Sequence, residues 1–92
     1  MDKLLINGAW RGGNGGAVKS FDPSTGEQIF EAAAATRGDV QEAVNAARAA
    51  FPGWALTPLD QRIEILRRYK GISERDAEKL ARLISRETGK PF

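Results

Sequence analysis

The residue types that perform most nucleophilic and acid–base chemistry are rare or absent in this sequence. Its 92 residues include no Cys and no His, which excludes a thiol nucleophile, an imidazole base, a disulfide and a Cys/His zinc site. Ser, Thr, Tyr, Lys and carboxylates remain, and a hydroxyl or amine nucleophile needs a base beside it. No such pair can be assembled from the sequence, so we expect no catalytic or metal-binding residue in this chain.

One pair of carboxylates could act in acid–base chemistry if the two groups were close enough. Glu27 and Glu31 are four residues apart in a predicted strand, which puts them on one face about 13 Å apart by strand rise. The two carboxyl groups that act on a single glycosidic bond lie about 5 to 9.5 Å apart. The pair is therefore too widely spaced for that chemistry.

Two glycine-containing segments resemble phosphate-binding loops only in part. The first has four glycines among residues 12–16, but it leads into a predicted strand, whereas a dinucleotide-binding loop opens a helix. We interpret it as a mobile hairpin loop. The second, Thr88-Gly89-Lys90, lacks the earlier glycine and the final hydroxyl of a Walker A motif. We interpret it as the end of a helix.

The charges nearly cancel, with 14 Lys and Arg against 12 Asp and Glu. Carboxylates alternate with the basic side chains of the second half, so we interpret these as solvated helix faces and predict no nucleic-acid partner. The basic residues concerned are Arg62, Arg67, Arg68, Lys70, Arg75, Lys79, Arg82 and Arg86. We interpret Trp10 and Trp54 as packing anchors rather than base-stacking platforms.

The elements that carry these residues fall into two predicted regions, a β-hairpin region at 1–35 and a helical region at 36–92. The dipeptide Asn7-Gly8 joins residues 4–6 to 9–11, and both of its residues accept the positive φ of a hairpin turn. A turn at 22–26 joins strand 17–21 to a strand that starts at 27 and runs into 32–35. The first region is thus predicted to form two hairpins.

The second region has apolar residues at helical spacing and is predicted to form three helices. Thr36 and Asp39 form a capping box that starts the first helix, and Pro52-Gly53 ends it, which leaves Trp54 in the connection. Thr57 caps the second helix, with Pro58 at its first position.

The second predicted helix is expected to break near residues 71–73, because Gly71 costs about 1 kcal/mol against alanine. Ser73 with Asp76 then opens the third helix, and Gly89 with Pro91 stops it. The isolated segment is therefore predicted to have an α+β fold. Residues 4–6 are too short an apolar run for a signal peptide, which needs about 7–15 residues. We expect a cytoplasmic protein with no membrane partner.

An ordered series of motifs resembles the N-terminal region of the NAD(P)-dependent aldehyde dehydrogenase superfamily. In the helical half these are residues 46–54 (AARAAFPGW), 57–62 (TPLDQR) and 86–91 (RETGKP). Residues 6–10 (INGAW) resemble the opening hairpin of the family, and 22–27 (DPSTGE) resemble its Asn-Pro-x-Thr-Gly-Glu turn. The resemblance implies part of an α/β coenzyme-binding domain, in a protein roughly five times the length of this chain and well beyond the size of one small domain.

The resemblance also implies an activity. Family members oxidise an aldehyde through a Cys thiolate, pass hydride to a nicotinamide, and hydrolyse the thioester with a Glu-activated water. None of the catalytic or coenzyme-binding residues of the family maps onto residues 1–92. We therefore expect NAD(P) in the full-length enzyme and none bound by this chain alone. Within the superfamily, residues 46–54 and 58–66 most resemble the enzymes that oxidise a succinylated glutamate semialdehyde in bacterial arginine catabolism.

The apolar stripes of the helices suggest what the chain contacts. They comprise Val40, Ala43, Val44, Ala47 and Phe51, then Leu59, Ile63, Leu66 and Tyr69, then Leu80 and Ile84. We expect them to pack on the remainder of an aldehyde dehydrogenase chain or on copies of this chain in a homo-oligomer. The missing cysteine indicates an N-terminal fragment that is inactive alone. The alternative is a free-standing structural, interaction or oligomerisation module without catalysis.

Overall fold

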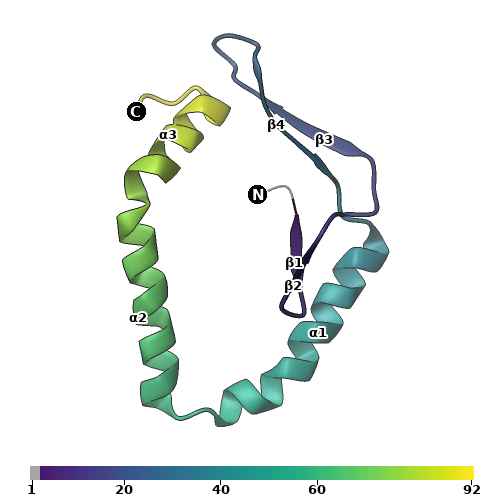
Figure 1. The fold of residues 1–92 in the computed structure, drawn as a ribbon, viewed down its shortest axis with the longest axis vertical. Helices are drawn as coiled ribbons and strands as arrows, with labels where there is room; N and C mark the ends of the chain where they lie inside the picture. The colour runs from purple at the N-terminus through teal and green to yellow at the C-terminus, as the bar shows by residue number, and fades with distance from the viewer. Residues whose placement is uncertain (1–2) are drawn as a thin grey trace.

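The computed structural model describes residues 3–92 and has two β-hairpins followed by three helices (Figure 1). The strands are β1 (Leu4–Ile6), β2 (Ala9–Arg11), β3 (Ala17–Phe21) and β4 (Gln28–Ala33). The helices are α1 (Arg37–Leu56), α2 (Leu59–Arg75) and α3 (Ala77–Thr88). This confirms the predicted fold class. Met1 and Asp2, which the sequence prediction placed in the hairpin region, lie outside the described residues.

Both hairpins are built on the predicted turns. β1 and β2 pair antiparallel across Asn7 and Gly8, whose φ angles of 52° and 75° are the positive values that this turn requires. In the second turn the Asp22 carboxylate accepts from the Ser24 amide at 2.8 Å, and Gly26 has a φ of 76°. Each hairpin therefore follows from a few local residues.

Strand β4 begins later than predicted. The Asp22 amide donates to the Glu27 carbonyl at 2.8 Å, so Glu27 closes the turn, and the pairing with β3 shifts register between Ser20 and Phe21. Only Glu31 lies in the strand, opposite Lys19. The prediction that Glu27 and Glu31 share one strand face is wrong, because the turn consumes one more residue than the sequence pattern suggested.

Helix α1 continues through the predicted stop at Pro52-Gly53 and ends at Leu56, so Trp54 lies in the helix rather than in a connection. A proline inside a helix costs about 3 kcal/mol, and α1 tolerates this cost. At the C-terminal end of the helix, Thr57 satisfies carbonyls of the last turn. Its amide donates to the Trp54 carbonyl at 3.0 Å, and its hydroxyl donates to the Gly53 carbonyl at 2.9 Å. Thr57 therefore ends α1, and its predicted role as the cap of α2 is wrong.

Helix α2 starts after Pro58, which makes no side-chain cap hydrogen bond, and runs through Gly71 and Ser73 to Arg75. The predicted break at 71–73 is wrong, because the glycine penalty of about 1 kcal/mol is small for a helix of this length. The break falls at Asp76, whose carboxylate accepts from Arg75 at 3.0 Å instead of capping α3. Gly89 ends α3 with a φ of 76°, as predicted.

The elements follow one another around an open ring rather than packing about a centre (Figure 1). The Cα radius of gyration is 17.0 Å, against about 12 Å for a compact domain of this length. Contacts between different kinds of element join α1 to β1 and α3 to β3, while α1 and α2 diverge from Thr57. Among residues 3–92 no hydrophobic side chain is buried, and no helix is long and apolar enough to cross a membrane.

Candidate functional site

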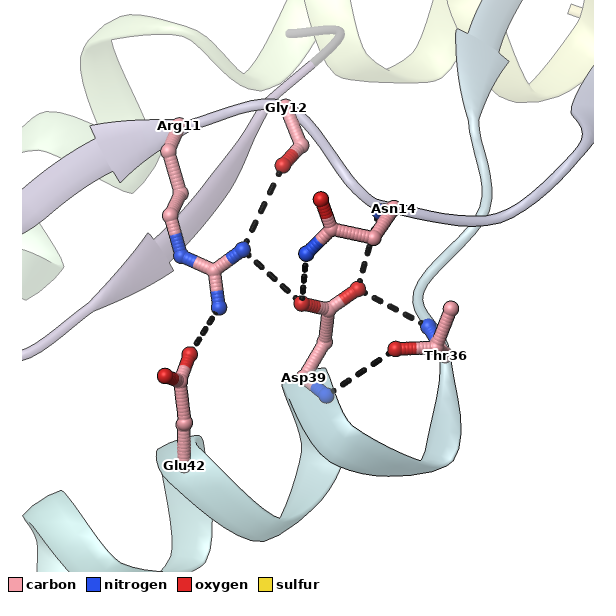
Figure 2. A network of polar contacts seen from close by, with 6 residues as sticks. All are labelled: Arg11, Gly12, Asn14, Thr36, Asp39 and Glu42. Atoms are coloured by element: carbon pink, nitrogen blue, oxygen red, sulfur yellow. Dashed lines mark hydrogen bonds and ion pairs between the residues drawn. The ribbon is translucent and has the colours of Figure 1, made fainter.

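The one buried residue in the part of the chain that the structure describes is a charged one. Asp39, in the first turn of α1, is 2% exposed. It is the centre of a group of polar side chains that we call the Asp39 cluster, shown in Figure 2. The members of the cluster are Arg11, Asn14, Thr36, Asp39 and Glu42.

Each carboxylate oxygen of Asp39 accepts two hydrogen bonds (Figure 2). Oδ1 accepts from Arg11 Nη1 at 2.8 Å and from Asn14 Nδ2 at 2.7 Å. Oδ2 accepts from the backbone amides of Asn14 at 3.0 Å and Thr36 at 2.9 Å. The Asp39 amide donates to the Thr36 hydroxyl at 3.2 Å, which completes the predicted capping box. One carboxylate therefore joins β2, the glycine loop and α1.

The electrostatics of the cluster favour a permanent charge on Asp39. Hydrogen bonds from the Thr36 and Asn14 amides, then from Arg11, hold the pKa of the Asp39 carboxyl far below its ordinary value. The hydrogen bond to Asp39 raises the pKa of Arg11, whose other arm also pairs with Glu42. A carboxylate that stays ionised throughout the physiological range is a poor proton donor or acceptor. The cluster is therefore suited to holding elements together rather than to acid–base catalysis.

The glycine loop, predicted to be mobile, lies against the end of β4 and is hydrogen-bonded to it. The Gly15 amide donates to the Ala34 carbonyl at 2.8 Å, and the Ala34 amide donates to the Gly16 carbonyl at 2.8 Å. A Cβ atom at Gly13 would lie 2.2 Å from the Ala34 carbonyl oxygen, so only glycine permits this approach.

The residues of the glycine loop and the start of α1 do not fit a dinucleotide phosphate. Such a site needs free backbone amides at the positive end of a helix. Here the amides of Asn14 and Gly15 already donate to Asp39 and Ala34, and the Asp39 carboxylate occupies the first helical turn. A phosphate would meet a negative charge there, so these residues do not form a phosphate-binding site.

A hollow beside the cluster offers no reactive group either. It has a volume of about 550 Å³, and its charged lining residues are Arg11 and Glu42, which pair with each other. Among residues 3–92 there is also no group of three or more His, Cys, Asp or Glu side chains placed to hold a metal ion.

The two tryptophans and the basic residues of the second half lie outside the Asp39 cluster. Trp10 and Trp54 are 61% and 42% exposed, so neither is a buried packing anchor within residues 3–92. Three of the basic side chains of α2 and α3 pair with neighbouring carboxylates, at Lys70–Glu74, Arg75–Asp76 and Arg82–Glu78. Mixed charges on solvated helix faces are thus observed.

Stability contributed by Asp39 should depend on pH in one direction. Because folding lowers the pKa of its carboxyl, the contribution is complete above the unfolded pKa of about 3.9 and is lost as the pH falls toward the folded value. We expect the difference in denaturation midpoint between the wild-type sequence and Asp39→Asn to be constant from pH 7 to 5 and to shrink below about pH 4. The denaturation midpoints are measured on a folded protein that contains the segment. A difference that already shrinks near pH 6 would contradict the assignment.

Comparison with known proteins identifies the family. The aldehyde dehydrogenase family model matches residues 10–92. N-succinylglutamate 5-semialdehyde dehydrogenase 2 of Caulobacter vibrioides is 54% identical over 87 residues, which are 95% of this chain and 18% of that protein. N-succinylglutamate 5-semialdehyde dehydrogenase of Burkholderia mallei is 45% identical over 92 residues, all of this chain and 19% of that protein.

The fold matches as well. The crystal structure of an NAD-dependent benzaldehyde dehydrogenase from Corynebacterium glutamicum superposes with a TM-score of 0.90 at 31% identity, over 97% of this chain and 20% of that one. The chain thus spans about a fifth of the length of the proteins it matches. The fold, the family model and the sequence relatives agree: the chain belongs to the aldehyde dehydrogenase family.

Proposed function

We propose that the chain is the N-terminal part of a cytoplasmic, homo-oligomeric enzyme that oxidises N-succinylglutamate 5-semialdehyde to the acid with NAD(P)+. The observation that supports this substrate is the 45–54% identity with relatives named for it. Identity with the benzaldehyde dehydrogenase is lower, at 31%. The substrate-binding and catalytic residues of such an enzyme belong to the rest of its chain.

The role of this segment in the enzyme is structural, and we expect it to be inactive alone. It has no Cys to form the thiohemiacetal, and its one buried carboxylate is committed to four hydrogen bonds. The segment contributes a rigid junction between β2, the glycine loop and α1.

A free-standing interaction module is the second candidate. It is favoured by the large apolar side chains that remain exposed, among them Phe51 at 65% and Leu66 at 61%. A module of this kind has no need to work inside a dehydrogenase, so the two candidates differ in the outcome of a segment exchange.

The test is a chimera of the Caulobacter vibrioides relative in which the present sequence replaces the matched 87 residues. We expect the chimera to form NADH from N-succinylglutamate 5-semialdehyde at a rate within about tenfold of the parent, an allowance of about 1.4 kcal/mol in activation free energy. The parent enzyme without the segment is the negative control.

A second chimera in the Corynebacterium glutamicum benzaldehyde dehydrogenase tests the subfamily. Because identity is lower there, we expect this host to retain less of its parent activity. An inactive first chimera would contradict the enzyme proposal and favour the interaction module. Equal retention in both hosts would remove the support for the succinylglutamate subfamily.

A further inference from the structure

We propose that Asn7 is a site of spontaneous covalent modification, at which its side chain closes a succinimide ring with the backbone nitrogen of Gly8. The sequence contains two Asn-Gly pairs, Asn7-Gly8 and Asn14-Gly15. Ring closure is easiest before glycine, because glycine has no Cβ to hinder the approach of its nitrogen. The two pairs are chemically alike, and the fold leaves the first one reactive while it protects the second.

The reaction balances with water as its only co-reactant. The backbone nitrogen of Gly8 bonds to Cγ of Asn7, the bond from Cγ to Nδ2 breaks, and Nδ2 leaves as ammonia with the proton of the Gly8 amide. Water then opens the ring by adding a hydroxyl to one of its two carbonyl carbons and a proton to the nitrogen. Opening at Cγ gives aspartate, and opening at the main-chain carbonyl gives isoaspartate. No group is oxidised or reduced.

At Asn7 the fold leaves both reacting groups available. Asn7 and Gly8 form the turn between β1 and β2, and the ladder pairs Ile6 with Ala9, so the Gly8 amide lies outside it. A Cβ at Gly8 would meet no atom within 4 Å. Asn7 also borders the open hollow of about 550 Å³ beside α1. Water and the attacking nitrogen can therefore both reach the side chain.

The hairpin around Asn7 is short enough to open. Attack on Cγ requires the peptide unit after Asn7 to rotate away from its turn geometry, in which Asn7 has a φ of 52°. The ladder of β1 and β2 has only three residue pairs, and an isolated two-stranded hairpin is marginally stable in water. Local opening at the tip of such a turn supplies the rotation that the reaction needs.

At Asn14 the corresponding groups are held by hydrogen bonds. The Gly15 amide, which would have to attack, donates to the Ala34 carbonyl at 2.8 Å. The leaving group Nδ2 of Asn14 donates to Asp39 Oδ1 at 2.7 Å (Figure 2). Negative charge that develops on the Asn14 carboxamide during attack would also face the buried Asp39 carboxylate, which repels it. Both asparagines are exposed as whole residues, so these contacts, and not access of water, separate the two pairs.

The protected pair is the one whose modification would harm the fold more. A carboxylate at position 14 would lie where Nδ2 of Asn14 now donates to Asp39, and would replace an attraction with a repulsion. At position 7 the products add a charge to an exposed turn, and isoaspartate lengthens its backbone by one methylene. That change disturbs the short pairing of Ile6 with Ala9 and leaves the Asp39 cluster intact.

The experiment follows both pairs in the folded Caulobacter chimera during incubation in mildly alkaline buffer below its thermal midpoint. Trypsin separates the pairs, because cleavage after Lys3, Arg11 and Lys19 gives one peptide for each. Mass spectrometry detects the exchange of the amide for a hydroxyl, with a sample taken before incubation as the blank. We expect Asn7 to react at least about tenfold faster than Asn14 in the folded chimera, and within about threefold of it in denaturant.

Two variants test whether contact with the end of β4 protects Asn14. Gly13→Ala places a Cβ 2.2 Å from the Ala34 carbonyl oxygen, which displaces the loop, and we expect the Asn14 rate to rise by at least about fivefold. Gly12→Ala is the matched control, because its Cβ meets no atom within 4 Å, and it should leave that rate unchanged. Neither variant should change the rate at Asn7. Circular dichroism checks that both remain folded.

Each outcome bears on the inference. Equal rates at the two asparagines in the folded chimera would overturn it, and so would an unmodified Asn7 in a chimera that reacts at both sites once unfolded. A preference for Asn7 that persists in denaturant would assign the difference to sequence and not to the fold. Equal Asn14 rates in the two variants would overturn protection by the glycine loop. The peptide masses are read without turnover, so an inactive chimera would count against the proposed function alone.

Discussion

Replacing Gly13 with alanine is expected to destabilise the folded dehydrogenase chimera by about 3 kcal/mol. The added Cβ would lie 2.2 Å from the Ala34 carbonyl oxygen and 2.6 Å from that of Ala33. Both are backbone atoms, so no side chain can rotate away. The loop would have to move off the end of β4 and break the bond between the Gly15 amide and Ala34.

Gly12→Ala is the matched control for this prediction. A Cβ at Gly12 meets no atom within 4 Å, and its φ is not in the left-handed region. We expect its effect on the unfolding free energy to stay within about 0.5 kcal/mol, because alanine also restricts the unfolded chain. Denaturant midpoints of the two variants measure the difference. Similar midpoints would show that the loop does not lie against β4.

The second large effect is expected for Asp39→Asn. Both carboxylate oxygens accept two donors, so the amide nitrogen of asparagine would face two donors in either orientation. In one orientation Arg11 and the Asn14 side chain would lose their acceptor, and in the other the backbone amides of Asn14 and Thr36 would lose theirs, in the one buried site among residues 3–92. We expect the thermal midpoint of the chimera to fall by roughly 5 °C or more.

Glu42→Gln is the control within the same cluster. The Glu42 side chain is 65% exposed, and Arg11 keeps its bond to Asp39 when Glu42 is neutral. Exposed ion pairs contribute about 0–1 kcal/mol, so the thermal midpoint should change little. A larger loss from Glu42→Gln than from Asp39→Asn would contradict the central position of Asp39.

The parts of the fold that sequence alone predicted are those governed by a few adjacent residues. Asn7-Gly8 specifies the first hairpin, and the capping box of Thr36 and Asp39 specifies the start of α1. The predictions at Pro52 and Gly71 were wrong because each used one local penalty, of about 3 and 1 kcal/mol, as a stop signal. Hydrogen bonds elsewhere in the helices outweigh penalties of that size.

The Asp39 cluster could be predicted only in its local half. Thr36 lies three residues from Asp39, but Asn14 and Arg11 lie 25 and 28 residues away. No spacing rule connects positions so distant, and the pairing depends on the glycine loop lying against β4. The glycines themselves were visible, yet the close approach that requires them involves Ala33 and Ala34 of a different segment.

The most direct test is an aldehyde oxidation assay of the purified chain alone, beside the chimera that contains it. With N-succinylglutamate 5-semialdehyde and NAD+ or NADP+, the chimera should reduce the coenzyme. The isolated chain should give no aldehyde-dependent reduction above the protein-free rate, since it has no Cys. Aldehyde-dependent NADH or NADPH formation by the isolated chain would contradict the conclusion that the chemistry belongs to the rest of the enzyme.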